Sequence, residues 1–385
     1  MIELKGTTWD HPRGLGGLAA TAAAYQEHHP EVQITWQARS LQEFADFSVE
    51  RLAEKYDLLV FDHPFIGAGA RSGCLVPLDE YLPARFLAQQ AAGSVGQSHV
   101  SYAFEGHQWA LAVDAACHVS AYRPDLLARL DHELPRTWDE VRQLARAALK
   151  NGLSMAVPLI PVDAFMCIYS LCANAGEPPC RTPDYFVSRR VGRHVLILLR
   201  ELFAYSHPRS QTWNPPRMLD EMASGDLLVY CPLTFGYSNY AREGDGKRLV
   251  RFGAIPAGAD GPAGAILGGA GLGISSSCPH PQAAAQYAAY VASPEIQSTV
   301  YVDGGGQPGH RSAWLDRHAN EITHNFFSDT LETIDHSYLR PRFAGYVKMQ
   351  DEAFTIASRF LTTNVNIDRT LDDLDVLYRA SLSGS

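Results

Sequence analysis

The sequence predicts an α/β protein made of two lobes, and two observations lead to this fold class. Strand-like and helix-like segments alternate from the start of the chain, as they do in α/β sheets. The chain has 385 residues, more than the roughly 250–300 at which a single hydrophobic core stops growing. Its 46% hydrophobic and 19% charged residues are those of an ordinary globular protein.

The opening segments follow the order β-α-β-α-β. The pattern predicts a strand at 2–9, a helix at 18–29, a strand at 32–36 and a helix at 41–54. Residues 58–61 are four consecutive apolar residues of β-favouring type, which suits a strand in a parallel sheet that is covered on both faces. The sequence therefore predicts that the first lobe begins as a parallel sheet.

Later segments extend this pattern. A strand at 108–113 keeps its character through 117–122, past Asp114, and is long enough to pass from one lobe into the other. One further helix is expected to start at 123–125, and another to follow Thr137 as its N-cap. The other expected elements include helices at 164–175, 191–205 and 216–223, strands at 227–232, 253–256 and 272–275, and helices at 281–291, 294–300, 342–362 and 370–381.

Charge and composition exclude several classes of protein. The net charge is −10 and the 32 lysines and arginines are scattered, so nucleic acid is not an expected partner. No window of about 18 apolar residues predicts a membrane-spanning helix. Seven cysteines, an odd number without metal-type spacing, exclude a full disulfide framework and favour the cytoplasm. The strand-like start at Ile2 is unlike a secretory signal, so either that signal was removed or the natural protein is never exported.

Two predicted strands end in the same tripeptide, Asp-His-Pro, at residues 10–12 and 62–64. Ligands of open α/β sheets bind beyond the carboxyl ends of the strands, so both turns are expected to face one site. Asp10, His11, Asp62 and His63 could bind a metal if they converged. They could instead form acid/base pairs, or simply make hydrogen bonds and cap the following helices.

The first turn carries further candidates for ligand contacts. Trp9 could stack on a sugar face, Asp10 could accept hydrogen bonds from hydroxyls, and Arg13 could clamp a carboxylate or phosphate. The alternative is that Asp10 caps the helix and that Pro12 stiffens the turn.

A second group of candidates lies in the predicted crossing strand and beyond it. Asp114 interrupts an apolar strand, where a charge is costly unless it is paired or wet, so it is expected to meet the ligand or to form a hinge salt bridge. His118 and Tyr122 on the same strand are expected to be packing and hinge residues. Phe235, Tyr237 and Tyr240 could stack on sugar rings, or could form a surface loop packed on its own rings.

Two glycine-rich segments, 268–271 and 304–306, are expected to form tight turns close to the ligand. Gly269 would let the backbone approach a ligand, and Gln307 is a candidate contact. Neither segment matches a dinucleotide fingerprint or a phosphate-binding loop. The sequence contains no hydrolase or zinc motif and calls for no cofactor.

Several local motifs, in this order along nearly the whole chain, resemble the extracellular solute-binding proteins of family 1, the maltose-binding-protein-like receptors of ABC importers. The matching segments are 56–60 with 73–79, 121–127 with 135–140, 222–226, 268–274, 304–308 with Arg311, and 367–374.

This resemblance implies a type II periplasmic-binding fold, with two α/β lobes joined by a hinge and a ligand in the cleft between them. The lobes would be 1–112 plus 268–312, and 113–267 plus 313–385. The family's late helix lines the cleft, which makes Arg342 a candidate ligand contact, with surface or lobe packing as the alternative. A monomer, an ABC permease as partner and a periplasmic or extracellular location are also expected.

Two functional hypotheses follow. The first is a receptor that closes on a small polar solute, a carbohydrate or polyol, for import. The second is a cytoplasmic enzyme or sensor of the same fold that uses Asp10, His11, Asp62 and His63 for acid/base or metal chemistry on a small polar or acidic substrate.

Overall fold

The computed structural model describes residues 1–40, 48–244 and 246–382, which form two compact units. Unit 1 comprises residues 1–116, 268–327 and 342–344, and unit 2 comprises 117–267, 328–341 and 345–385. The chain changes unit after residues 116, 267, 327, 341 and 344, whereas the expected lobes change after residues 112, 267 and 312.

Unit 1 is built on the sheet that its first segments predict. Strand β1 (Ile2–Trp9) pairs in parallel with both β2 (Val32–Arg39) and β3 (Leu58–Asp62), and β10 (Leu267–Ile274) lies antiparallel to β3. The order along the sheet is β2-β1-β3-β10. The predicted parallel opening is therefore confirmed, with helix α1 (Gly17–His28) between β1 and β2.

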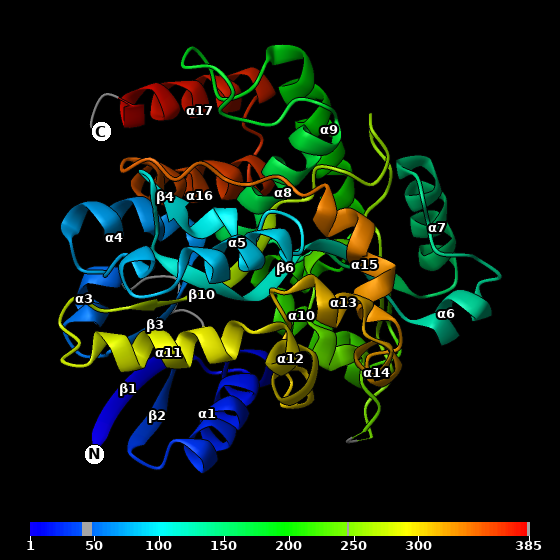
Figure 1. Ribbon diagram of the computed structural model, residues 1–385. Coiled ribbons are helices and arrows are strands. Elements are labelled where there is room, and N and C mark those ends of the chain that lie inside the picture. Colours follow the sequence, from blue (N-terminus) through cyan, green and yellow to red (C-terminus); the bar gives the residue numbers. More distant parts are fainter. Residues whose placement is uncertain (41–47, 245, 383–385) are drawn as a thin grey trace. The chain divides into compact units, whose positions relative to one another are not determined.

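Both faces of this sheet are covered. Successive side chains of β3 point to opposite sides, and they enter two different cores. Leu58 and Val60 join a core under α1 and α11 (Pro281–Ala292), helices that lie together in Figure 1. Leu59 and Phe61 join a second core with α3 (Val49–Ala53) and α4 (Ile66–Ser72). Residues 41–47 of the predicted helix 41–54 lie outside the described part of the chain.

The remaining helices of unit 1 are short. They are α5 (Ala84–Ala92), α12 (Pro294–Ile296), α13 (Arg311–Leu315) and α14 (Arg317–Ile322), and α15 (Phe326–Asp335) begins in unit 1 and ends in unit 2.

Strand β6 (Ala110–Tyr122) is continuous past Asp114, as predicted, and its first half belongs to unit 1 and its second half to unit 2. In unit 2 it pairs antiparallel with β8 (Leu228–Phe235) and β9 (Arg251–Gly253), and β7 (Ser154–Met155) lies parallel to β8.

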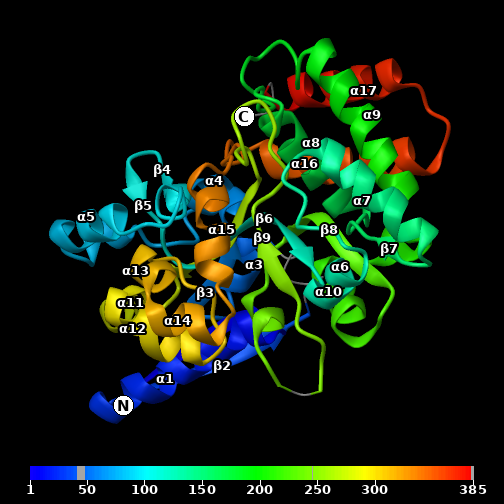
Figure 2. The ribbon, with the colours of Figure 1, turned by 90° about the vertical axis from the view of Figure 1, so that its right-hand side faces the viewer.

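The helices of unit 2 cluster around α8 (Pro161–Asn174), which is buried from Asp163 to its end. Helices α9 (Arg189–Tyr205) and α16 (Tyr346–Thr362) pack against α8, and α17 (Ile367–Leu382) packs against both of them (Figure 2). The other helices are α6 (Pro124–Arg129), α7 (Trp138–Lys150) and α10 (Pro215–Ser224). Helix α7 begins with a capping box of Thr137 and Glu140, and Thr137 is the predicted N-cap.

Two sequence-based expectations about elements are wrong. Residues 268–271 do not form a tight turn but lie within β10, where the small glycines fit against neighbouring strands and rings. The predicted helix 342–362 starts only at Tyr346, so Arg342 lies ahead of it. The residue just before this helix is Gly345, and a larger residue would not fit there, since a Cβ would lie 2.3 Å from the Ser381 carbonyl oxygen.

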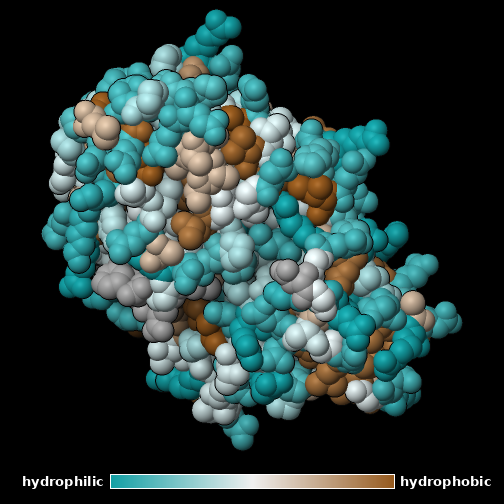
Figure 3. Space-filling model, turned by 90° about the horizontal axis from the view of Figure 1, so that it is seen from below, coloured by the Kyte–Doolittle hydropathy of each residue, from teal (hydrophilic) through white to brown (hydrophobic). Residues whose placement is uncertain are grey.

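One face of the surface is mixed in character (Figure 3). On the face that Figure 3 shows, hydrophobic residues form separate groups among hydrophilic ones. Among the described residues, no helix combines the length and the apolar character needed to cross a membrane. All seven cysteines are free thiols.

Candidate functional site

The turn after β1 is capped by His11 and not by Asp10. The His11 Nδ1 atom accepts a hydrogen bond of 3.0 Å from the Arg13 N–H, and this bond opens the π-helical turn Pro12–Gly16. Asp10 is exposed to solvent. The alternative role of Asp10 as a helix cap is therefore wrong, because the helical turn begins at Pro12 and its N-cap position is residue 11.

Arg13 and Asp114 form a buried ion pair in unit 1. The Arg13 Nε and Nη2 atoms lie 2.8 Å and 2.5 Å from the two Asp114 carboxylate oxygens, and the side chains are 5% and 1% exposed. Burial raises the pKa of Asp114, and the adjacent guanidinium opposes this by favouring the ionised carboxylate. Asp114 thus has the ion-pair partner that a buried charge requires.

Trp9 is buried in the core of unit 1, on the α1 side of the sheet. Its ring centroid lies 6.0 Å from the Arg13 guanidinium carbon, and a Cβ on Gly14 would come within 2.4 Å of the ring. Trp9 therefore packs the turn that holds Arg13.

The turn after β3 is arranged differently. Here Asp62 is the cap: its Oδ1 atom accepts a 2.9 Å hydrogen bond from the His63 N–H, and the short 3-10 helix His63–Phe65 follows. The His63 ring is fully buried, with Nδ1 3.1 Å from Asp62 Oδ1 and with the Tyr102 ring edge-on at 6.4 Å.

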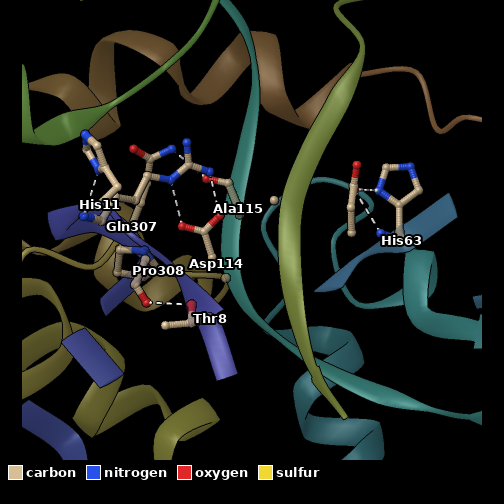
Figure 4. Close-up of polar contacts among 12 residues, drawn as sticks. Thr8, His11, His63, Asp114, Ala115, Gln307 and Pro308 are labelled. Atoms are coloured by element: carbon tan, nitrogen blue, oxygen red, sulfur yellow. Dashed lines mark hydrogen bonds and ion pairs between the residues drawn. The ribbon is translucent and has the colours of Figure 1, made fainter. Parts of the chain in front are cut away.

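The two imidazoles do not share one site. Figure 4 shows His11 and His63 apart, with the teal strand that carries Asp114 between them in this view. Across residues 1–40, 48–244 and 246–382, no three His, Cys, Asp or Glu side chains are grouped so that they could hold a metal ion.

Five predicted site residues do meet in unit 1, and we call Arg13, Asp62, Asp114, Gly269 and Gln307 the strand-end cluster. The charge of Asp62 acts on Asp114, and a Cβ on Gly269 would lie 2.4 Å from the Asp114 carbonyl oxygen. The buried Gln307 makes two hydrogen bonds with Ala115. Its main-chain carbonyl oxygen accepts the Ala115 N–H at 3.0 Å, and its side-chain Nε2 atom donates to the Ala115 carbonyl oxygen at 2.8 Å (Figure 4).

Within this cluster, the backbone at Gly269 approaches β6 closely, at a φ of +110° that favours glycine.

Arg342 lies in unit 1 but is not a member of the cluster. Its Nη1 atom donates to the carbonyl oxygens of Val100, Ser101 and Ala103 at 2.7–2.9 Å.

The aromatic residues at the end of β8 and just after it lie in unit 2. The Phe235 ring meets the His118 ring at 4.5 Å in a T-shaped contact, and Tyr237 and Tyr240 form another at 6.4 Å. The Tyr240 hydroxyl donates to the Pro216 carbonyl and lies 3.1 Å from Asp220 Oδ1, and burial raises its pKa. Tyr237 and Tyr240 therefore pack on each other, and Tyr240 also contacts α10.

A polar stripe on α8 is missing from the sequence-based candidates. Asp163, Cys167, Ser170 and Asn174 lie at positions i, i+4, i+7 and i+11, which form one face of a helix. That spacing within an otherwise apolar segment is the signal that could have revealed the stripe from the sequence. Asn174 bonds the Trp138 ring N–H and the carbonyl oxygens of Pro256 and Ala263.

Asp163 is the acidic residue of this stripe. It is 6% exposed in the first turn of α8, and its Oδ2 atom has no hydrogen-bond partner among the described residues. Burial raises the pKa of Asp163 to about 8. A carboxyl group that is neutral at pH 7 can both donate and accept hydrogen bonds.

Comparisons with solved structures show the same fold over the whole chain. The maltose-bound MalE3 of T. maritima has a TM-score of 0.82 at 18% identity, with 100% of both chains covered. The GacH receptor of Streptomyces glaucescens has a TM-score of 0.81 at 16% identity, over 99% of this chain and 98% of that one. A ribitol complex of an ABC transporter solute-binding protein from Agrobacterium radiobacter has a TM-score of 0.79 at 18% identity, over 98% of both chains.

Sequence comparisons agree with this fold. The maltotriose-binding protein of Pyrococcus abyssi is 26% identical over 133 residues, which are 34% of this chain and 28% of that protein. The match thus spans less than a third of the length of that relative. The family model described as bacterial extracellular solute-binding protein matches residues 20–318. Because this match covers most of the 385 residues, the chain belongs to the bacterial extracellular solute-binding proteins and has the α/β fold of MalE-like binding proteins.

Proposed function

We propose that this protein is the solute receptor of an ABC-type importer and that its solute is a small neutral carbohydrate or polyol. The observation that carries the proposal is the family match over residues 20–318. Solved structures of the same fold, among them complexes with maltose and with ribitol, support this class of ligand.

The charges of the described residues favour a neutral solute over an acidic one. The charge of Arg13 is paired with Asp114, and Arg342 donates hydrogen bonds to three carbonyl oxygens. Neither arginine supports the recognition of a carboxylate or phosphate. Asp163 offers a buried carboxyl group whose raised pKa keeps it neutral, which suits hydrogen bonding with hydroxyl groups.

The partner and the location follow from the same proposal. A receptor of this class delivers its solute to an ABC permease in the membrane, and the matched family is described as extracellular. We therefore infer a periplasmic or extracellular location and a permease partner for this protein.

The hypothesis of an enzyme built on the two Asp-His pairs has less support. His63 is fully buried, and the two imidazoles are separated in Figure 4. No observation among the described residues joins them into one acid/base or metal centre.

The test is a thermal and calorimetric screen of the full chain with maltose, maltotriose, ribitol and D-tagatose, with citrate and glucose 6-phosphate as acidic probes. A ligand at 100 times its Kd stabilises the folded state by about 2.7 kcal/mol, so a bound sugar or polyol should raise the Tm by several degrees. Binding of an acidic probe alone would overturn the proposal.

A matched pair of variants places the solute. Asp163→Ala should weaken the binding of the active probe at least tenfold, because a polar group that contacts the solute is lost. Asp10→Ala removes an exposed carboxylate and is the control for a general effect of charge. Equal affinities of the two variants would exclude Asp163 as a contact.

A further inference from the structure

We propose that His118 is a ligand-binding side chain that donates its Nε2–H to a hydroxyl oxygen of the solute, with Ser170 as the positioning residue. This inference rests on the proposed function, and it assigns a binding role to a residue whose sequence context predicts a packing and hinge role. Its basis is a chain of hydrogen bonds inside unit 2 that leaves one ring nitrogen for a further contact.

The Ser170 hydroxyl connects His118 to the backbone. The Ile266 N–H donates to Ser170 Oγ at 2.9 Å, and Ser170 Oγ lies 2.8 Å from His118 Nδ1. Among the described residues, Nδ1 is the acceptor that remains for the hydroxyl proton of the fully buried Ser170. A buried hydroxyl proton without an acceptor costs about 1–3 kcal/mol, so the Ser170 hydroxyl donates to Nδ1.

This bond assigns the tautomer of the imidazole. Because Nδ1 accepts a hydrogen bond, the proton of a neutral ring is on Nε2. The ring is neutral, since burial and the nearby Arg340 charge lower the pKa of His118 to about 3. His118 therefore presents an N–H donor in one fixed orientation.

The Nε2 atom has no hydrogen-bond partner within the described residues, although His118 as a whole is only 2% exposed. The atom is not among the fully buried side-chain atoms without a partner, so an acceptor from outside the protein, such as a solute hydroxyl, can reach its proton. The half-buried Phe235 ring lies 4.5 Å from the imidazole, with an interplanar angle of 61°. An apolar ring beside a polar donor matches the mixed C–H and hydroxyl surface of a sugar or polyol.

Two substitutions separate the ring nitrogens. His118→Asn keeps an acceptor near the Nδ1 position for Ser170 but has no donor at Nε2, whereas His118→Gln can present an amide N–H near Nε2. With the probe that binds the native chain best among maltose, maltotriose, ribitol and D-tagatose, His118→Asn should lose at least tenfold in affinity. His118→Gln should lose clearly less, and both variants should keep a Tm close to that of the native chain.

A ligand-free measurement keeps the inference testable if a variant fails to fold. In the native chain labelled with 15N-histidine, the His118 ring should give the spectrum of the neutral Nε2–H tautomer between pH 5 and 8, and the active probe should shift the Nε2 resonance. A Nδ1–H tautomer, or an unshifted Nε2 resonance in the presence of the bound probe, would overturn the inference.

The failures of the two proposals are distinguishable. A native chain that binds a probe, together with a folded His118→Asn variant whose affinity is within twofold of native, overturns the role of His118 alone. A native chain that binds none of the probes overturns the proposed function, and the role of His118 falls with it.

Discussion

The same tripeptide, Asp-His-Pro, follows β1 and begins at the last residue of β3, but the two turns use it in opposite ways. After β1 the imidazole of His11 caps the turn and Asp10 is exposed. After β3 the carboxylate of Asp62 caps the turn and His63 is fully buried. Identical residues thus exchange their roles, which shows that the neighbours of a motif decide what it does.

The residues after each proline explain the exchange. Pro12 is followed by Arg13 and Gly14, and the turn closes over Trp9 while Arg13 reaches Asp114. Pro64 is followed by the apolar residues of 65–66, with Ile66 fully buried at the start of α4. The first turn therefore buries a charge pair, whereas the second buries a ring.

The largest expected effect comes from breaking the charge pair of the first turn. Arg13→Ala leaves the Asp114 carboxylate buried without its partner, so the free energy of unfolding should fall by about 3–5 kcal/mol. Urea denaturation of the native chain and the variant measures this change.

The double variant Arg13→Ala/Asp114→Ala is the control, because it removes both charges. It should be more stable than Arg13→Ala alone, since no buried charge is left uncompensated. If the double variant is less stable than Arg13→Ala, the cost of the single substitution comes from lost packing and not from the unpaired carboxylate.

The next effect compares the two histidines. His63→Ala empties a fully buried site and should cost about 2–3 kcal/mol, as large-to-small substitutions in cores do. His11→Ala removes a capping contact at a partly exposed position and should cost about 1 kcal/mol. Thermal and urea denaturation of both variants give the two values side by side, and equal costs would contradict the exchange of roles.

The strands and the helix-rich second half could be predicted largely from the sequence. The pattern of apolar residues identifies β1, β3 and the long β6. In β3 the signal is four apolar residues in a row, and in β6 it is an apolar segment that continues past a single charged residue. Gly268–Gly271 shows the limit of that reasoning. Glycines indicate a turn in isolation, but here they serve the close packing of a strand against β6, which depends on residues far away in the sequence.

The candidate site was harder to predict because its contacts are long-range. The sequence shows that Asp114 needs a partner, but not that Arg13, 101 positions earlier, provides it. The spacing of Asp163 with the other polar residues of α8 is visible in the sequence, but its burial by distant segments is not. Local patterns therefore indicate where polar groups stand, while tertiary packing decides which of them are already engaged.

The smallest effect compares the two aspartates. Asp62→Ala removes the oxygen that accepts the His63 N–H and lies beside the His63 ring, so it should cost about 1–2 kcal/mol. Asp10→Ala changes an exposed side chain and should stay within about 0.5 kcal/mol of the native chain. Urea denaturation of both variants under one set of conditions measures the difference.

Asp62→Asn separates the capping oxygen from the charge, because asparagine keeps an acceptor for the His63 N–H. A small cost for Asp62→Asn and a larger one for Asp62→Ala would show that the hydrogen bond is what fixes the second turn. Equal costs would show instead that the negative charge beside the buried imidazole matters, so that the second turn, like the first, would depend on an electrostatic contact.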